Sequence, residues 1–191
     1  MSEEIIISTQ HLPQVIAGPI VRKVTSNSCH VWLVSSNADA PSLSLSHGDS
    51  VLAGDSQGDT VRVGKHAFIH LVIFSASTSF EDRERINYKL AFDDHQQQNA
   101  WEEEQRALLY KDQASLSFHY TGTPETILHG SCRKPHFHGD DALVQVDNLH
   151  KIAFEEKASF PDLLLMTGDQ IYADDVAGPM LKAIHCVIAR L

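Results

Sequence analysis

The sequence predicts an all-β unit followed by the beginning of an α/β unit, and two observations lead to this prediction. Up to residue 93 the apolar residues fall in short, mostly alternating runs, and Gly-Asp pairs at 48–49, 54–55 and 58–59 mark turns between them. After residue 125, apolar runs are each followed by apolar residues at helical spacing. Strand, helix, strand, helix is the order of a parallel sheet.

The first unit, residues 15–93, follows an N-terminal tail at 1–14. Its predicted strands are 15–24, 29–34, 42–46, 60–63, 67–74 and 86–92. Short strands at this spacing are typical of an antiparallel β-sandwich of immunoglobulin or fibronectin-III type. Alternation places Ile86, Tyr88, Leu90 and Phe92 on one face, and Trp32 is expected in the core.

A linker at 94–125 is expected to contain a helix over residues 100–110 that packs through Trp101, Leu108 and Leu109. The second unit, 126–191, then begins with a strand at 127–131. Asp140 or Asp141 can cap the next helix, in which Leu143, Val146, Leu149 and Ala153 recur at helical spacing. The apolar run at 162–167 is expected to be a strand buried on both faces, followed by a helix from Val176.

That last helix reaches Leu191 without a glycine cap, and two parallel strands cannot form a covered sheet alone. We therefore expect a fragment whose α/β domain continues elsewhere. An exposed sheet edge of this kind is also expected to promote self-association.

Charge, cysteine content and the absence of targeting patterns limit the partners and locations expected for the chain. The chain has 191 residues and a formal net charge of -10, which argues against nucleic acid or an anionic membrane as partner. Three widely spaced cysteines form no disulfide framework. The N-terminus has no signal-peptide pattern and no window is long enough to span a membrane, so a cytoplasmic location is expected.

Reactive side chains are expected at the carboxyl ends of the two parallel strands. The first end supplies residues 130–134 (Gly-Ser-Cys-Arg-Lys) and the second supplies 167–175, so Cys132 and Asp169 should lie close together. Together with Tyr172 they offer a thiolate, a carboxylate and a phenolate. Such ligands suit a hard, trivalent-leaning cation such as iron, with a second metal bridged by the aspartate.

These segments resemble the alkaline phosphatase D (PhoD-like) family, which is similar to the wider calcineurin-like metallophosphoesterases. The similarity rests on 130–134 and on 168–174 (Gly-Asp-Gln-Ile-Tyr-Ala-Asp). The resemblance implies a β-sandwich ahead of a metallophosphoesterase-like α/β domain, iron and calcium as cofactors, and a small phosphate ester as substrate. It implies Cys132, Asp169 and Tyr172 as metal ligands, with Arg133 and Asp174 as catalytic candidates.

Two departures from the family follow. Its members are often exported, whereas no export signal is found here, and the family's later asparagine, aspartate and histidine ligands have no counterpart. We therefore expect the isolated chain to lack appreciable activity.

Alternative interpretations remain for each residue. Cys132 could be a buried structural cysteine, Asp169 a cap, Tyr172 an ordinary aromatic and Arg133 a surface charge. His136 and His138 match no closed zinc pattern and indicate a surface loop.

The sequence excludes two other functions and leaves a third open. A cysteine-nucleophile phosphatase needs arginine at position 138, where the chain has His138. A phosphate-loop nucleotide binder fails because Gly64-Lys65 is followed by His66. The remaining rival is a non-catalytic β-sandwich interaction module with a vestigial α/β segment.

Overall fold

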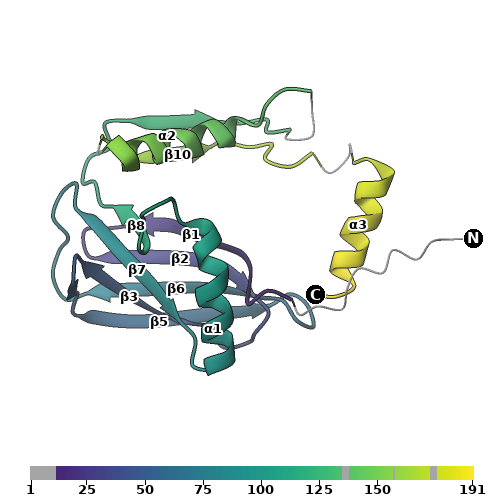
Figure 1. Ribbon diagram of the computed structural model, residues 1–191, viewed down its shortest axis with the longest axis horizontal. Helices are drawn as coiled ribbons and strands as arrows, with labels where there is room; N and C mark the ends of the chain where they lie inside the picture. Colours follow the sequence, from purple (N-terminus) through teal and green to yellow (C-terminus); the bar gives the residue numbers. More distant parts are fainter. Residues whose placement is uncertain (1–11, 135–137, 157, 173–175) are drawn as a thin grey trace, which may run out of the picture.

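The computed structural model describes residues 12–134, 138–156, 158–172 and 176–191 (Figure 1). The elements are β1 (Val15–Val24), β2 (Ser28–Ser35), β3 (Ser42–His47), β4 (Ser50–Val51), β5 (Gly54–Arg62), β6 (Phe68–Ala76), β7 (Arg85–Ala91), α1 (His95–Glu104), the 3-10 helix η1 (Gln105–Leu108), β8 (Leu116–His119), β9 (Ile127–Gly130), α2 (Ala142–Glu156), β10 (Leu163–Met166) and α3 (Gly178–Ile188).

The first eight strands form two four-stranded sheets, in the orders β1-β2-β6-β5 and β4-β3-β7-β8. Every pairing within them is antiparallel. The arrangement is compatible with the predicted β-sandwich, and we call it the two-sheet unit.

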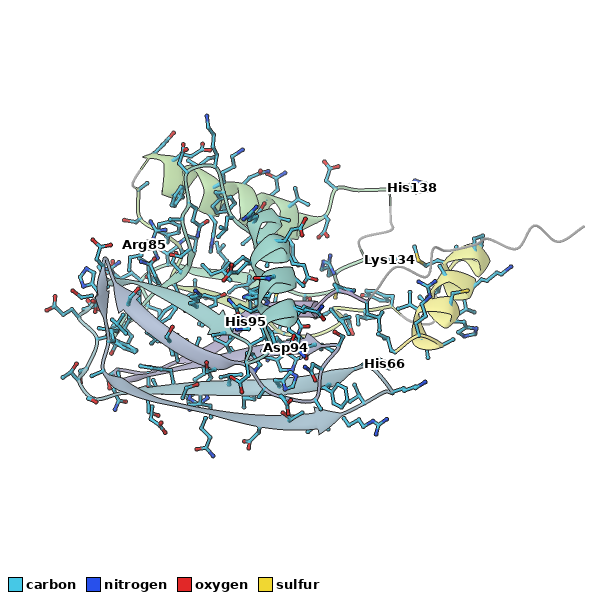
Figure 2. The ribbon with its side chains drawn as sticks, turned by 60° about the horizontal axis from the view of Figure 1, so that its bottom comes forward. His66, Arg85, Asp94, His95, Lys134 and His138 are labelled. Carbon is cyan, nitrogen blue, oxygen red and sulfur yellow. The ribbon has the colours of Figure 1, made fainter. Side chains whose placement is uncertain are left out.

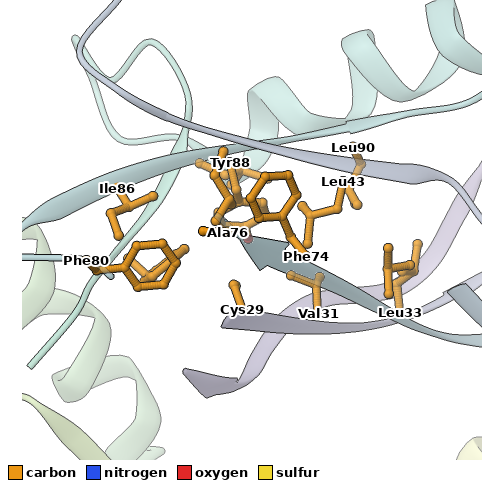
Figure 3. Close-up of a cluster of buried hydrophobic side chains, with 14 of the residues drawn as sticks. Cys29, Val31, Leu33, Leu43, Phe74, Ala76, Phe80, Ile86, Tyr88 and Leu90 are labelled. Carbon is orange, nitrogen blue, oxygen red and sulfur yellow. The ribbon is translucent and has the colours of Figure 1, made fainter. Parts of the chain in front are cut away.

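One hydrophobic core lies within the two-sheet unit, and strand alternation explains which side chains enter it (Figure 3). Leu43 and Leu45 on β3 point inward, while Ser42 and Ser44, which alternate with them, are exposed. The residues expected on one face of β7 and just beyond it, Ile86, Tyr88, Leu90 and Phe92, are all buried, which confirms that prediction.

The two-sheet unit extends past the boundary expected at residue 93. Strand β8 pairs with β7, and Trp101 of α1 is only 1% exposed within the core. The Glu104 side chain at the end of α1 accepts hydrogen bonds from the backbone N–H of Gln14 (2.7 Å) and of Val15 (2.9 Å). Much of the expected linker is therefore part of this unit.

The prediction that Trp32 is a core aromatic is wrong. Val31 and Leu33 on β2 are fully buried, so the alternation places Trp32 on the opposite face, where it is half-buried. Trp101 fills the core instead and contacts Phe92 edge to face, with ring centroids 6.5 Å apart.

A polar cluster around the buried His70 links the edge strand β5 to β6 and β2. His70 on β6 is fully buried, with Nδ1 2.9 Å from Thr60 Oγ1 and Nε2 2.8 Å from Ser35 Oγ. Nε2 also lies 3.1 Å from the Asn37 carbonyl, which can only accept, so we assign the proton to Nε2 and let Thr60 donate to Nδ1. Burial is the main reason that the His70 pKa is lowered.

The remaining elements form an α/β unit in which β9 and β10 pair in parallel, as predicted. Asp141 accepts a hydrogen bond from the Leu143 N–H (3.1 Å) and so caps α2, as expected for Asp140 or Asp141. Figure 1 shows α2 running alongside the two strands and α3 off to one side, and the Leu191 carbonyl after α3 accepts a hydrogen bond from the backbone N–H of His66, in the turn before β6.

The β10 strand is not buried on both faces, contrary to expectation. Leu163, Leu164 and Leu165 are 42%, 42% and 46% exposed. An apolar run predicts a buried strand only when layers cover both faces, and α2 is the helix beside it in the described residues.

The two units meet where Asp162 precedes β10. Its carboxylate accepts from the N–H groups of Glu125 and Thr126, both at 2.8 Å, and from the Thr121 hydroxyl at 3.0 Å. These bonds, above all those from Thr126 and Glu125, lower the Asp162 pKa. In the described part of the chain, no helix has both the length and the apolar character needed to cross a membrane.

Candidate functional site

The candidate site lies at the carboxyl ends of β9 and β10. Their register pairs Leu163 with Ile127 and Met166 with Gly130. Two further hydrogen bonds continue the pairing, from Thr167 N to the Gly130 carbonyl (3.0 Å) and from Cys132 N to the Gly168 carbonyl (3.1 Å). The two loops therefore leave the sheet side by side.

These loops bring Cys132 and Asp169 into contact. The Cys132 Sγ lies 3.5 Å from Asp169 Oδ2, which confirms that the two residues are close. The Ser131 hydroxyl lies 3.6 Å from the same sulfur. Cys132 is exposed, so it is not the buried structural cysteine of the alternative interpretation.

Both residues have a left-handed backbone, with φ of 53° at Cys132 and 52° at Asp169. Such a conformation costs a residue with a Cβ about 1–2 kcal/mol. Residues held in this region concentrate at functional sites, where the surrounding structure enforces them. Both contacting residues therefore sit at positions where the backbone disfavours a Cβ.

A cavity of about 390 Å³ opens beside Cys132, between the start of α2 and one face of the two strands. Its lining is part apolar and part polar. The apolar residues include Leu128, Leu143, Val146, Leu149, Leu164 and Met166, and the polar ones include Ser131, Cys132, Arg133, Lys134, Asp140 and Asp141.

Arg133 forms a bidentate ion pair with Asp141, the cap of α2. Its Nε lies 3.1 Å from Oδ1 and its Nη2 lies 2.6 Å from Oδ2. This pairing and the Leu143 N–H lower the Asp141 pKa. Arg133 thus fastens the start of α2 to the loop that carries Cys132, and it is more than a solvated surface charge.

Of the two remaining candidates, the structure describes Tyr172 but not Asp174. The Tyr172 ring lies beneath the Lys134 ammonium, with Nζ 5.9 Å from the ring centroid, and Lys134 lines the cavity. Asp174 and His136 lie outside the described residues. The structure therefore brings Cys132 and Asp169 together and puts Tyr172 beside Lys134, which lines the same cavity.

The Cys132–Asp169 pair can be tested for its fit to a metal. A thiolate at about 2.3 Å and a carboxylate oxygen at about 2.1 Å, at 90–109°, hold their donor atoms about 3.1–3.6 Å apart. The observed 3.5 Å falls in this range. Within the described residues, however, no group of three or more His, Cys, Asp or Glu side chains gathers.

Two residues near the site were not singled out from the sequence. His129 Nε2 lies 2.8 Å from Thr167 Oγ1 and joins the two strand ends. Gln170 donates to the Gly168 carbonyl at 2.5 Å, and its Oε1 is buried without a hydrogen-bond partner in the described part of the chain. In the sequence, only their position at or just after a predicted strand end could have indicated that they lie near the site.

Comparison of the chain with protein-family models, with curated proteins and with solved structures finds no match.

Proposed function

We propose that Cys132 and Asp169 are ligands of the metal centre of a phosphohydrolase, a phosphomonoesterase or phosphodiesterase similar to the PhoD-like family. The contact of 3.5 Å between thiol and carboxylate, at the carboxyl ends of two parallel strands, carries this proposal. Iron and calcium are the proposed metals, and a small phosphate ester is the proposed substrate. When bound, the metals would polarise the phosphoryl oxygens and lower the pKa of a bound water.

The other residues take supporting roles in this proposal. Tyr172 supplies a further ligand and Asp174 a further acidic group. Arg133 acts through Asp141 to hold the start of α2 against the cavity, whose volume of about 390 Å³ suits a small molecule. The proposal also assigns the two-sheet unit to the immunoglobulin or fibronectin-III type and the α/β unit to a metallophosphoesterase-like domain.

A non-catalytic interaction module is the second candidate. One observation favours it: in the described residues, Cys132 and Asp169 are joined by no third His, Cys, Asp or Glu. A thiol and a carboxylate alone bind a metal far more weakly than a complete ligand set does. The two candidates differ in whether the folded chain binds metal at Cys132.

Metal affinity is the decisive measurement. Equilibrium dialysis with Fe²⁺ and with Ca²⁺, followed by elemental analysis, would compare the wild type with Cys132→Ser and Asp169→Asn. Matched controls are Cys186→Ser in α3 and Asp112→Asn in a turn. We expect each site variant to weaken binding about 10-fold or more, since second-shell changes alone cost about 10- to 100-fold.

A wild type that binds no metal, or binds it equally after both site substitutions, would contradict the metal centre and favour the interaction module. Hydrolysis of p-nitrophenyl phosphate and of its bis-ester should be assayed in parallel. We expect no appreciable turnover by this chain, because its described residues provide too few ligands. Turnover that Cys132→Ser abolishes would show instead that the chain carries a working site.

A further inference from the structure

A second cavity, of about 340 Å³, lies between the two-sheet unit and the α/β unit. Its lining comes from β7, β8 and α2, and from the segments before β7, after β8 and between α2 and β10. The lining residues are Arg83, Arg85, His119, Thr121, Ala153, Phe154, Ala158, Ser159, Phe160 and Asp162. We call it the interdomain cavity.

The interdomain cavity is separate from the Cys132 site. Asp162 precedes β10, whereas Cys132 and Asp169 follow the opposite ends of β9 and β10. Strands of this length separate their two ends by roughly 10–13 Å. Figure 2 shows Arg85 and Lys134 toward opposite sides of the molecule.

Several ring contacts build the aromatic wall of the cavity. Phe160 stacks on His119, with centroids 4.3 Å apart and planes at 25°. His150 meets the same Phe160 edge to face, at 5.8 Å. The Arg85 guanidinium carbon lies 4.9 Å from the Phe154 ring centroid. These contacts hold the arginine in place within a partly apolar wall.

The two arginines of the cavity differ in how their charge is balanced. Arg83 pairs with Glu125 at 2.8 Å and lies 3.8 Å from Asp162. Arg85 donates from Nε to the Ser117 hydroxyl at 3.2 Å. No carboxylate of the described residues forms an ion pair with Arg85, and its two terminal nitrogens make no hydrogen bond there.

Asp162 cannot readily serve as the missing partner. Its carboxylate already accepts from the Glu125 and Thr126 N–H groups and from the Thr121 hydroxyl. Burial, then Arg85, then His150 lower the His119 pKa, while Asp162 opposes them only as the smallest influence. Arg85 is thus the positive group that acts most strongly on His119, in a chain whose formal net charge is -10.

We propose that the interdomain cavity binds a small organic anion whose carboxylate or phosphate group pairs with the Arg85 guanidinium and whose apolar part lies against Phe154 and Phe160. The terminal nitrogens of an arginine match the two oxygens of such a group in a bidentate pair. Ser159 lies on the same lining and offers a hydroxyl as a further donor. The volume of about 340 Å³ is at the lower end of the range for small-molecule sites.

Nuclear magnetic resonance of the imidazole groups tests this proposal, because His119 lines the cavity and His150 contacts its wall. The probes are phenyl phosphate, benzoate, inorganic phosphate and benzyl alcohol, which carries the ring without the charge. We expect phenyl phosphate or benzoate to shift the His119 resonances saturably and to raise the His119 pKa, since a nearby anion favours the protonated ring. Benzyl alcohol should leave them unchanged.

Arg85→Gln should weaken binding of the effective probe about 10-fold or more, as expected for loss of a charge-assisted hydrogen bond. Arg106→Gln, which removes the same charge from an exposed position in η1, should leave the affinity unchanged. A response to phenyl phosphate alone would identify a phosphate site, and a response to benzoate alone a carboxylate site.

Equal responses to benzoate and benzyl alcohol would overturn the proposal, because the cavity would then bind apolar rings without regard to charge. So would the absence of any response, or undiminished affinity in Arg85→Gln. If Arg85→Gln fails to fold, the comparison of charged and neutral probes on the wild type still decides the question. The metal centre proposed at Cys132 has no part in this test.

Discussion

The Cys132 thiol and the Asp169 carboxylate meet at 3.5 Å, and both residues carry a positive φ, of 53° and 52°. Two other residues with a side chain share this conformation in the described part of the chain, Arg83 and Asp112. A backbone conformation that disfavours a Cβ thus recurs at both members of the contacting pair. This backbone strain should lower the free energy of unfolding, an effect that can be measured without any metal.

Replacement of Cys132 by glycine should give a more stable protein than replacement by alanine, by about 1 kcal/mol. Both changes remove the thiol, so the difference between them isolates the cost of a Cβ at positive φ. Denaturant unfolding of the two variants measures it. The same pair at Cys186, inside helix α3, is the control, and there alanine should be the more stable by about 1 kcal/mol. If alanine is more stable than glycine at both positions, the backbone at Cys132 is not strained and the prediction is wrong.

The buried His70 should make the two-sheet unit sensitive to acid. Its pKa is lowered in the folded state, chiefly by burial, so below the ordinary histidine pKa of about 6.5 the unfolded chain binds more protons. The free energy of unfolding should therefore fall as the pH drops below about 6.5 and continue to fall until the lowered pKa is passed. His70→Asn should be less stable at pH 8, because hydrogen bonds to Thr60 and Ser35 are lost or altered, yet should show a shallower slope in this window. If the free energy of unfolding of wild type and variant depends equally on pH in this window, the pKa of His70 is not lowered by folding.

Trp101 should be as important to the two-sheet unit as any strand residue. Trp101→Ala should cost about 3–5 kcal/mol of unfolding free energy, the usual loss for a buried large aromatic. Trp32→Ala, at a half-buried position on the outer face of β2, is the matched comparison and should cost less. A chain that stops at residue 93 should fail to give cooperative unfolding, because it lacks both Trp101 and β8. Cooperative folding of residues 1–93 would contradict this account of the unit.

The exposed leucines of β10 should promote self-association. Leu163 and Leu165 lie on the face that does not line the cavity beside Cys132, and Ile127 pairs with Leu163 there. Leu165→Lys should weaken association about 10-fold or more, since burial of one leucine contributes about 1.5–3 kcal/mol. Light scattering over a range of concentrations measures it. Val61→Lys, at an exposed apolar position on β5, should leave association unchanged. A wild type that stays monomeric at all concentrations would refute the prediction.

Local periodicity was sufficient for much of the fold. Alternation correctly grouped Ile86, Tyr88, Leu90 and Phe92 on one face, because side chains on successive strand residues point to opposite faces. The order of strand and helix predicted the parallel pairing of β9 and β10. That pairing in turn predicted the contact between Cys132 and Asp169, since the carboxyl ends of parallel strands lie at one edge. The metal and the reaction remain proposals.

Other features depended on contacts between distant residues. Alternation cannot tell which face of β2 points inward, so the sequence wrongly predicts Trp32 in the core, where Trp101 lies instead. The pairing of Arg133 with Asp141 depends on where the start of α2 comes to rest. The interdomain cavity joins Arg85 and His119 of one unit with Phe154 and Phe160 of the other, and no periodic signal links these positions. The sequence by itself therefore determined what repeats along the chain, whereas the tertiary structure alone decided which distant side chains meet, because those contacts form only when separate elements pack together.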